Sequence, residues 1–131
     1  MKKSLLIEAL KIASKKFKNH SEKYIHYSFI IQNNKIIEWG MNRPGHPAKH
    51  YGYNKKSIDP TFVAKIHAEI DAFQKAKGLL NKTKYFDIIN IRVNKEGKLR
   101  ISKPCICCFH LLKELGCRNF YYTNEEKFEI C

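Results

Sequence analysis

The chain has 131 residues, of which 44% are hydrophobic, and this is the size and composition of one globular domain with its own core. No apolar run approaches membrane-spanning length, and the lysine-rich start precedes only three consecutive apolar residues, so we expect neither a membrane span nor a secretory signal. We therefore expect one cytoplasmic domain covering residues 1–131.

The formal net charge of +13 arises from 25 basic and 12 acidic residues, and all but four of the basic residues are lysine. A basic balance of this size is typical of proteins that bind nucleic acid. It is equally typical of an AT-rich genome, which enriches Lys, Ile and Asn together without any binding role. Both interpretations of the charge stay open.

The first predicted elements are a helix and a β-hairpin. A helix that ends near Phe17 is predicted, because apolar residues recur along this segment at helical spacing. Ser4 can cap its N-terminus. Residues 24–32 and 35–40 are rich in Ile, Tyr and Phe and are predicted to be strands. The asparagine pair 33–34 tolerates positive φ and so predicts a tight turn between them.

A long loop is expected from Gly40 to Pro60. Loops of this length inside a compact domain are usually functional or disordered, and the histidines, tyrosines and cations in this one favour a function. A helix is predicted to follow, with Ile66, Ile70 and Phe73 on its buried face and its end at Gly78.

The rest of the chain is predicted to form a strand at 85–94, a helix at about 105–115 that ends at Gly116, and a strand at 118–123. Residues 124–131 are a candidate edge strand. This order implies an α/β fold of three layers, in which a mixed central sheet of four to five strands carries helices on both faces. The strand–helix–strand unit is expected to be a right-handed parallel crossover.

Two motifs stand at the starts of the second and third predicted helices. One is His67-Ala68-Glu69, and the other is the run from Pro104 to Cys108. In that run Cys105 and Cys108 are one helical turn apart, so both sulfurs point the same way. One His and two Cys form a known catalytic zinc set with an open fourth position, and H-x-E with P-C-x-x-C is a signature of zinc nucleobase deaminases.

Each motif alone has a simpler interpretation. The tripeptide His-Ala-Glu is common on helices without chemical consequence, and Cys105 with Cys108 could be half of a structural zinc site. His46 and His50 could bind a second metal, although a loop that contacts substrate is favoured. Three of the five cysteines crowd into 105–108, which favours metal binding in a reducing compartment over disulfides.

With these elements in order, the chain resembles the cytidine and deoxycytidylate deaminase superfamily, in the branch with a histidine zinc ligand. The resemblance covers nearly the whole chain in element order. The run from Gly40 to Pro44, together with His67-Ala68-Glu69, is similar to tRNA adenosine deaminases. The runs 102–105 and 121–123 are similar to small deoxycytidylate-type deaminases of microbes and viruses.

The resemblance implies that His67, Cys105 and Cys108 hold Zn²⁺ and that Glu69 is the catalytic proton shuttle. In such enzymes zinc lowers the pKa of a water molecule toward neutrality. The glutamate then delivers protons to the ring nitrogen and to the departing amine.

The resemblance also implies substrate contacts. Asn42 matches a family asparagine that contacts sugar or base, and the backbone of Ala68 contributes to the pocket. Arg43, His46 and His50 in the expected loop are candidates for contacting substrate and holding phosphate.

We therefore expect a zinc-dependent hydrolase that deaminates cytosine to uracil in a nucleoside or nucleotide and releases ammonia. One alternative is a polynucleotide deaminase that acts on tRNA or single-stranded DNA. The other is a catalytically silent zinc-binding interaction domain, against which Glu69 argues because a structural zinc site has no use for that carboxylate. Family members suggest a homodimer or higher homo-oligomer without a membrane partner.

Overall fold

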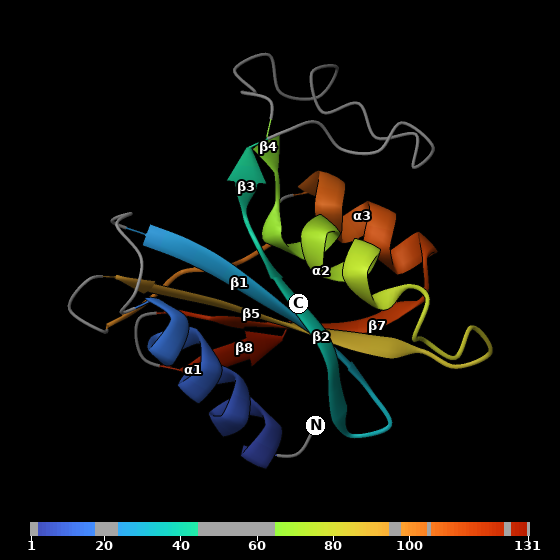
Figure 1. Ribbon diagram of the computed structural model, residues 1–131, viewed down its shortest axis with the longest axis horizontal. Coiled ribbons are helices and arrows are strands. Elements are labelled where there is room, and N and C mark those ends of the chain that lie inside the picture. Colours follow the sequence, from blue (N-terminus) through green and yellow to red (C-terminus); the bar gives the residue numbers. More distant parts are fainter. Residues whose placement is uncertain are drawn as a thin grey trace.

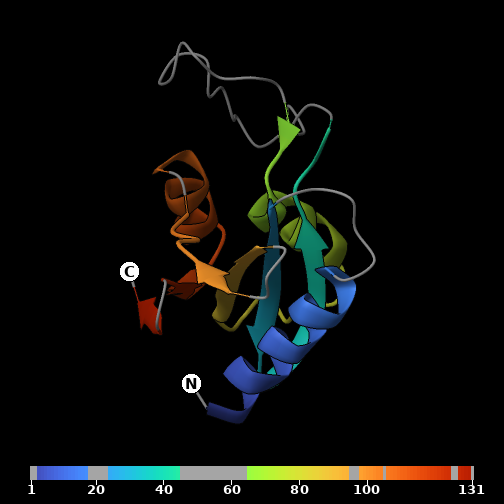
Figure 2. The same ribbon diagram turned by 90° about the vertical axis from the view of Figure 1, so that its left-hand side faces the viewer.

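The computed structural model describes residues 3–17, 24–44, 65–94, 98–104, 106–124 and 127–130. Its helices are α1 (Lys3–Phe17), α2 (Ala68–Ala76) and α3 (Ile106–Glu114). Helix α1 covers one face of a mixed sheet, and α2 and α3 lie side by side on the other (Figure 1, Figure 2). The predicted α/β fold with helices on both faces is confirmed. None of the described helices is both long and apolar enough to cross a membrane.

Among the described residues the main sheet has six strands: β1 (Tyr24–Gln32), β2 (Lys35–Met41), β5 (Phe86–Asn94), β6 (Leu99–Arg100), β7 (Cys117–Thr123) and β8 (Phe128–Ile130). Their spatial order is β2-β1-β5-β7-β8, and β6 pairs with β5. Strands β5 and β7 are parallel, as the expected crossover through α3 requires, and the other pairs are antiparallel. The predicted four to five strands become six because the chain turns back after β5 and places Leu99 opposite Val93.

The β1–β2 hairpin forms as predicted. Gln32 pairs with Lys35 across the turn, and the turn residues Asn33 and Asn34 have φ values of 54° and 59°. Two successive positive φ angles define the type of two-residue turn whose twist matches that of the flanking strands. Asparagine adopts this conformation more readily than other non-glycine residues.

Helix α1 begins at Lys3, so Ser4 lies inside the helix and the prediction that it caps the helix is wrong. Lysine has a higher helix propensity than serine, and the helix therefore extends past Ser4. Leu5, Ala9 and Ala13 recur every four residues and form its buried stripe. This spacing places them on one face, against the sheet.

The expected loop from Gly40 to Pro60 is shorter than predicted at its start. Strand β2 continues to Met41, and β3 (Arg43–Pro44) pairs antiparallel with β4 (Lys65–Ile66). Ile66 therefore belongs to a strand and not to the buried face of α2, because its backbone pairs with Arg43. The remainder of the expected loop lies outside the described residues.

Gly40 is the residue that allows β2 to approach α2. A Cβ atom at this position would lie 2.8 Å from both the Ala72 Cα and the Asp71 Oδ2 atoms, which is too close for any side chain. The Met41 N–H donates to Asp71 Oδ2 over 3.1 Å, and Lys75 Nζ lies 3.1 Å from the same oxygen. These contacts fix the first turn of α2 against the sheet.

Candidate metal and catalytic site

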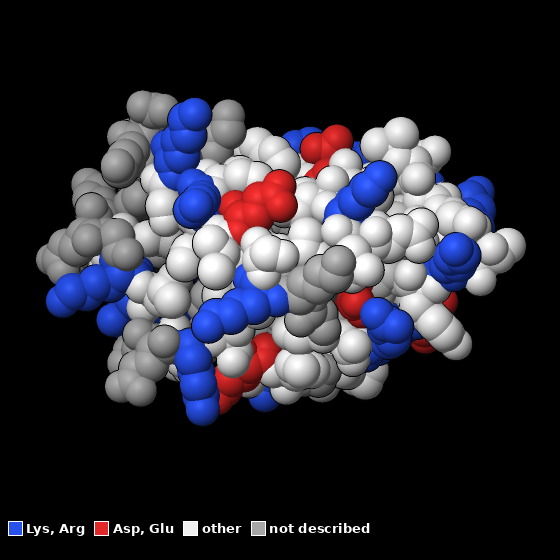
Figure 3. Space-filling view, turned by 90° about the horizontal axis from the view of Figure 1, so that it is seen from below, with Lys and Arg blue, Asp and Glu red and all other residues white. Residues whose placement is uncertain are grey.

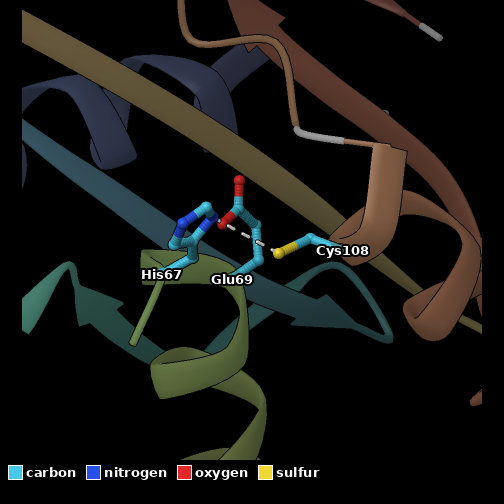
Figure 4. Close-up of side chains that lie close together, drawn as sticks. All are labelled: His67, Glu69 and Cys108. Carbon is cyan, nitrogen blue, oxygen red and sulfur yellow. Dashed lines mark hydrogen bonds between the residues drawn. The ribbon is translucent and has the colours of Figure 1, made fainter. Parts of the chain in front are cut away.

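His67 occupies the N-cap position of α2. Its backbone is extended (φ −72°, ψ 154°), its side chain makes no capping hydrogen bond, and its carbonyl oxygen accepts the Asp71 N–H at 3.0 Å. The imidazole points away from the end of the helix and toward Cys108 in α3 (Figure 4). The start of α2 thus positions a metal-binding side chain next to a second helix.

Cys108 and Glu69 complete a compact group with His67. The Cys108 side chain is fully buried in the first turn of α3, and its Sγ lies 3.6 Å from His67 Nδ1. Glu69 is buried in the first turn of α2. Donor atoms of the three side chains all lie within 4.8 Å of one another.

The spacing of this group fits a zinc ion. A thiolate sulfur about 2.3 Å and an imidazole nitrogen about 2.1 Å from one tetrahedral zinc are about 3.6 Å apart. The distance between Cys108 Sγ and His67 Nδ1 is 3.6 Å. These two residues are therefore already at the separation that a shared tetrahedral ion requires.

Sequence reasoning missed the residues that contact the Glu69 carboxylate from the sheet side. Asn90 in β5 donates from Nδ2 to Glu69 Oε1 over 2.7 Å, and Ser28 in β1 donates from Oγ to Asn90 Oδ1 over 2.6 Å. Ser28 and Asn90 are direct cross-strand partners. The available signal was a buried polar residue two positions from a buried isoleucine in each strand, Ser28 near Ile30 and Asn90 near Ile88.

The other predicted site residues divide into two groups. Ala68 is the buried first residue of α2, and Asn42 accepts the His26 N–H through Oδ1 at 3.1 Å, between β2 and β3. Arg43 begins β3, and only its backbone is described. Three other predicted site residues lie outside the described residues, and their roles stay predictions: His46, His50 and Cys105.

No protein-family model matches the chain, and no curated protein matches it. Solved structures share its fold. A cytidine deaminase from Burkholderia pseudomallei has a TM-score of 0.62 and 19% identity over 100% of this chain and 92% of that one. A dCMP deaminase from the cyanophage S-TIM5, in complex with dCMP and dUMP, has a TM-score of 0.57 and 20% identity over 95% and 84%.

The apo form of the phage enzyme gives the same TM-score of 0.57, at 21% identity over 97% of this chain and 88% of that one. At these identities the likeness establishes the fold. The chain therefore has the fold of cytidine and dCMP deaminases, which agrees with the resemblance drawn from its motifs.

Proposed function

We propose that the chain is a zinc-dependent hydrolytic deaminase that converts cytosine to uracil in a nucleoside or nucleotide. One observation carries the proposal. On a cytidine deaminase-like fold, His67 and Cys108 lie at the spacing of two ligands of one zinc ion, with the carboxylate of Glu69 beside them.

In this proposal His67, Cys108 and Cys105 hold the metal. Two thiolates and a neutral imidazole balance the charge of Zn²⁺ and leave one tetrahedral position open. A zinc ion bound there supplies Lewis-acid chemistry and lowers the pKa of water, so that hydroxide is available at neutral pH.

Glu69 transfers protons in this proposal. It accepts one proton from the attacking water and delivers it to the ring nitrogen N3, and it then accepts the second proton from the hydroxyl group formed on C4 and delivers it to the amino group on C4. The C4–N bond then breaks, ammonia departs and uracil remains. Burial of Glu69 beside His67 and Cys108 supports this role, because a proton-transfer group must lie within hydrogen-bond reach of the reacting atoms.

Two features support a nucleotide substrate. The Oδ1 atom of Asn42 accepts the backbone N–H of His26. We therefore assign the amide N–H groups of Asn42 to hydrogen bonds with the sugar or base of the substrate. Arg43 is paired with Ile66, the residue before His67, so the two strands that flank His46 and His50 in the sequence, β3 and β4, are paired next to the start of α2. We assign Arg43 and these histidines to the substrate phosphate.

We favour a mononucleotide over a polynucleotide because the Lys and Arg residues are distributed along the whole sequence. Figure 3 shows the α1 side of the molecule, opposite α2 and α3, and there too Lys and Arg are spread over the surface with Asp and Glu among them. A single-strand channel instead combines a basic groove with stacked aromatic side chains. The solved phage enzyme with dCMP and dUMP agrees with this choice.

The test is ammonia release by the zinc-loaded protein from cytosine, deoxycytidine, dCMP and a deoxycytidine oligonucleotide, with Glu69→Gln as the control of strongly reduced activity. We expect the nucleoside or nucleotide to be deaminated, with a shallow dependence of kcat/KM on salt. Deamination of the oligonucleotide alone, with kcat/KM falling steeply with salt, would assign the site to polynucleotides. If wild type released no ammonia from any of them, the proposed function would be wrong.

A further inference from the structure

Asn90 is a buried amide in a position where the fold otherwise places apolar side chains. It lies in β5 with 1% of its surface exposed, on the face that carries Phe86 and Ile88 in the core beneath α2 and α3. A buried amide is costly unless its donors and acceptor are all satisfied. Its partners therefore indicate why this position is polar.

The hydrogen bonds fix the orientation of the Asn90 amide. Its Nδ2 lies 3.2 Å from the backbone oxygen of Ser102, which can only accept, so this atom must be the NH₂ nitrogen. Its Oδ1 lies 2.6 Å from the Ser28 hydroxyl, which donates. The second amide hydrogen then points to Glu69 Oε1, 2.7 Å away. Every strong donor and acceptor of this amide is used.

This arrangement constrains one oxygen of the Glu69 carboxylate. Asn90 sits in the middle of a central strand, between β1 and β7, so its own position is fixed by backbone pairing on both sides. A carboxylate held at Oε1 by such a donor cannot rotate freely, and its second oxygen, Oε2, keeps a fixed direction. Proton transfer depends on this kind of alignment.

We propose that Asn90 is a positioning residue for the deamination, with Ser28 as its support. It holds Glu69 Oε1, and we assign proton exchange with water and substrate to the other oxygen, Oε2. This inference rests on the proposed function. A residue that only attached α2 to the sheet would instead affect stability, without a specific effect on turnover.

The kinetic test compares Asn90→Leu with Thr123→Val. Thr123 is fully buried in the same network, where its Oγ1 lies 2.8 Å from Ser102 Oγ, and it has no bond to Glu69 in the described structure. We expect Asn90→Leu to lower kcat about 10- to 100-fold with KM changed less than about threefold, as is usual for residues that orient a catalytic group. We expect Thr123→Val to keep kcat within about twofold. An unchanged kcat in Asn90→Leu overturns the proposal.

A double-mutant cycle separates positioning from a general structural effect. In a Glu69→Gln background, Asn90→Leu should lower the residual kcat no further, because the group that it positions is already disabled. A loss of the same size in both backgrounds overturns the proposal. Ser28→Ala, which leaves a smaller cavity, should give a smaller loss of kcat and serves if Asn90→Leu does not fold.

A second readout does not depend on activity. We expect the effects of Asn90→Leu and Glu69→Ala on the unfolding free energy to be non-additive in the double variant, by an amount that corresponds to about a tenfold change in the unfolding equilibrium constant, because each single change removes the same buried hydrogen bond. Additive effects would mean that the hydrogen bond is absent in solution and would overturn the proposal. If wild type deaminated no substrate, the proposed function would fail, and this cycle would still decide whether Asn90 holds Glu69.

Discussion

The two faces of the central sheet are built from the same strands but serve different purposes. Toward α1, strand β1 presents Tyr27 and Phe29, and this face is a continuous apolar core. Toward α2 and α3, the same strand presents Ser28 beside Ile30, and β5 presents Asn90. Because side chains alternate along a strand, one segment can stabilise the fold on one face and orient a functional carboxylate on the other.

Substitution of Glu69, which contacts the polar residues on the α2 side of the sheet, should have the largest effect on turnover. In Glu69→Gln we expect turnover to fall about 100- to 10,000-fold, because the change removes a proton-transfer group. Zinc content by elemental analysis and the urea midpoint should stay close to wild type. Loss of zinc in this variant would contradict the account, since it would make Glu69 a ligand.

Breaking the apolar face should affect stability instead of chemistry. Phe29 is fully buried against α1, and Phe29→Ala should lower the free energy of unfolding by about 3–5 kcal/mol in urea titrations. The kcat per folded molecule should be retained. The matched control is Ile7→Ala on the exposed side of α1, which should change stability by less than about 1 kcal/mol. A Phe29→Ala protein that is stable but inactive would show that the two faces are not separable.

Gly40 tests the contact between β2 and the start of α2. We expect Gly40→Ala to destabilise the protein by about 1–3 kcal/mol, because the added methyl group overlaps Ala72 and Asp71. Turnover should fall as well, since α2 carries Glu69. Gly78→Ala is the control: no atom would meet its methyl group within 4 Å, and stability should be equal to or slightly above wild type. Equal unfolding midpoints for both variants would contradict this account of Gly40.

The smallest effect is expected at Tyr27. Its hydroxyl is buried and has no hydrogen-bond partner among the described residues, so Tyr27→Phe should change the unfolding free energy by about 1 kcal/mol or less, in either direction. Burial raises the pKa of the Tyr27 phenol, so between its unfolded and folded pKa values the unfolded chain holds fewer protons and wild type loses stability as pH rises. Tyr27→Phe should weaken this alkaline loss in urea titrations. A large destabilisation at neutral pH would reveal a partner for the hydroxyl.

Much of the fold follows from local rules that act within a few residues. The asparagine turn and the flanking β-rich segments predict the first hairpin, and Gly116 ends α3 with a φ of 107°. The two-residue strands β3, β4 and β6 could not be predicted, because so short a segment has no periodicity. Their pairing depends on contacts between distant residues.

Some residues of the candidate site could likewise be predicted from local sequence, and others could not. His67, Glu69 and Cys108 were found as site candidates because H-x-E and P-C-x-x-C match the signature of zinc nucleobase deaminases, which can be read directly from the sequence. Asn90 was not found, because a polar residue in a largely buried strand shows that its position is unusual but not which group it contacts. Its partner Glu69 is 21 residues away, on another element.

The most direct test of the account is a crystal structure of the zinc-loaded protein with anomalous data at the zinc edge. We expect one zinc peak per chain, about 2.1 Å from His67 Nδ1 and about 2.3 Å from Cys108 Sγ, with Glu69 hydrogen-bonded to Asn90 and not coordinated to the metal. The absence of a peak at this position, or a Glu69 oxygen within about 2.2 Å of the metal, would contradict the account.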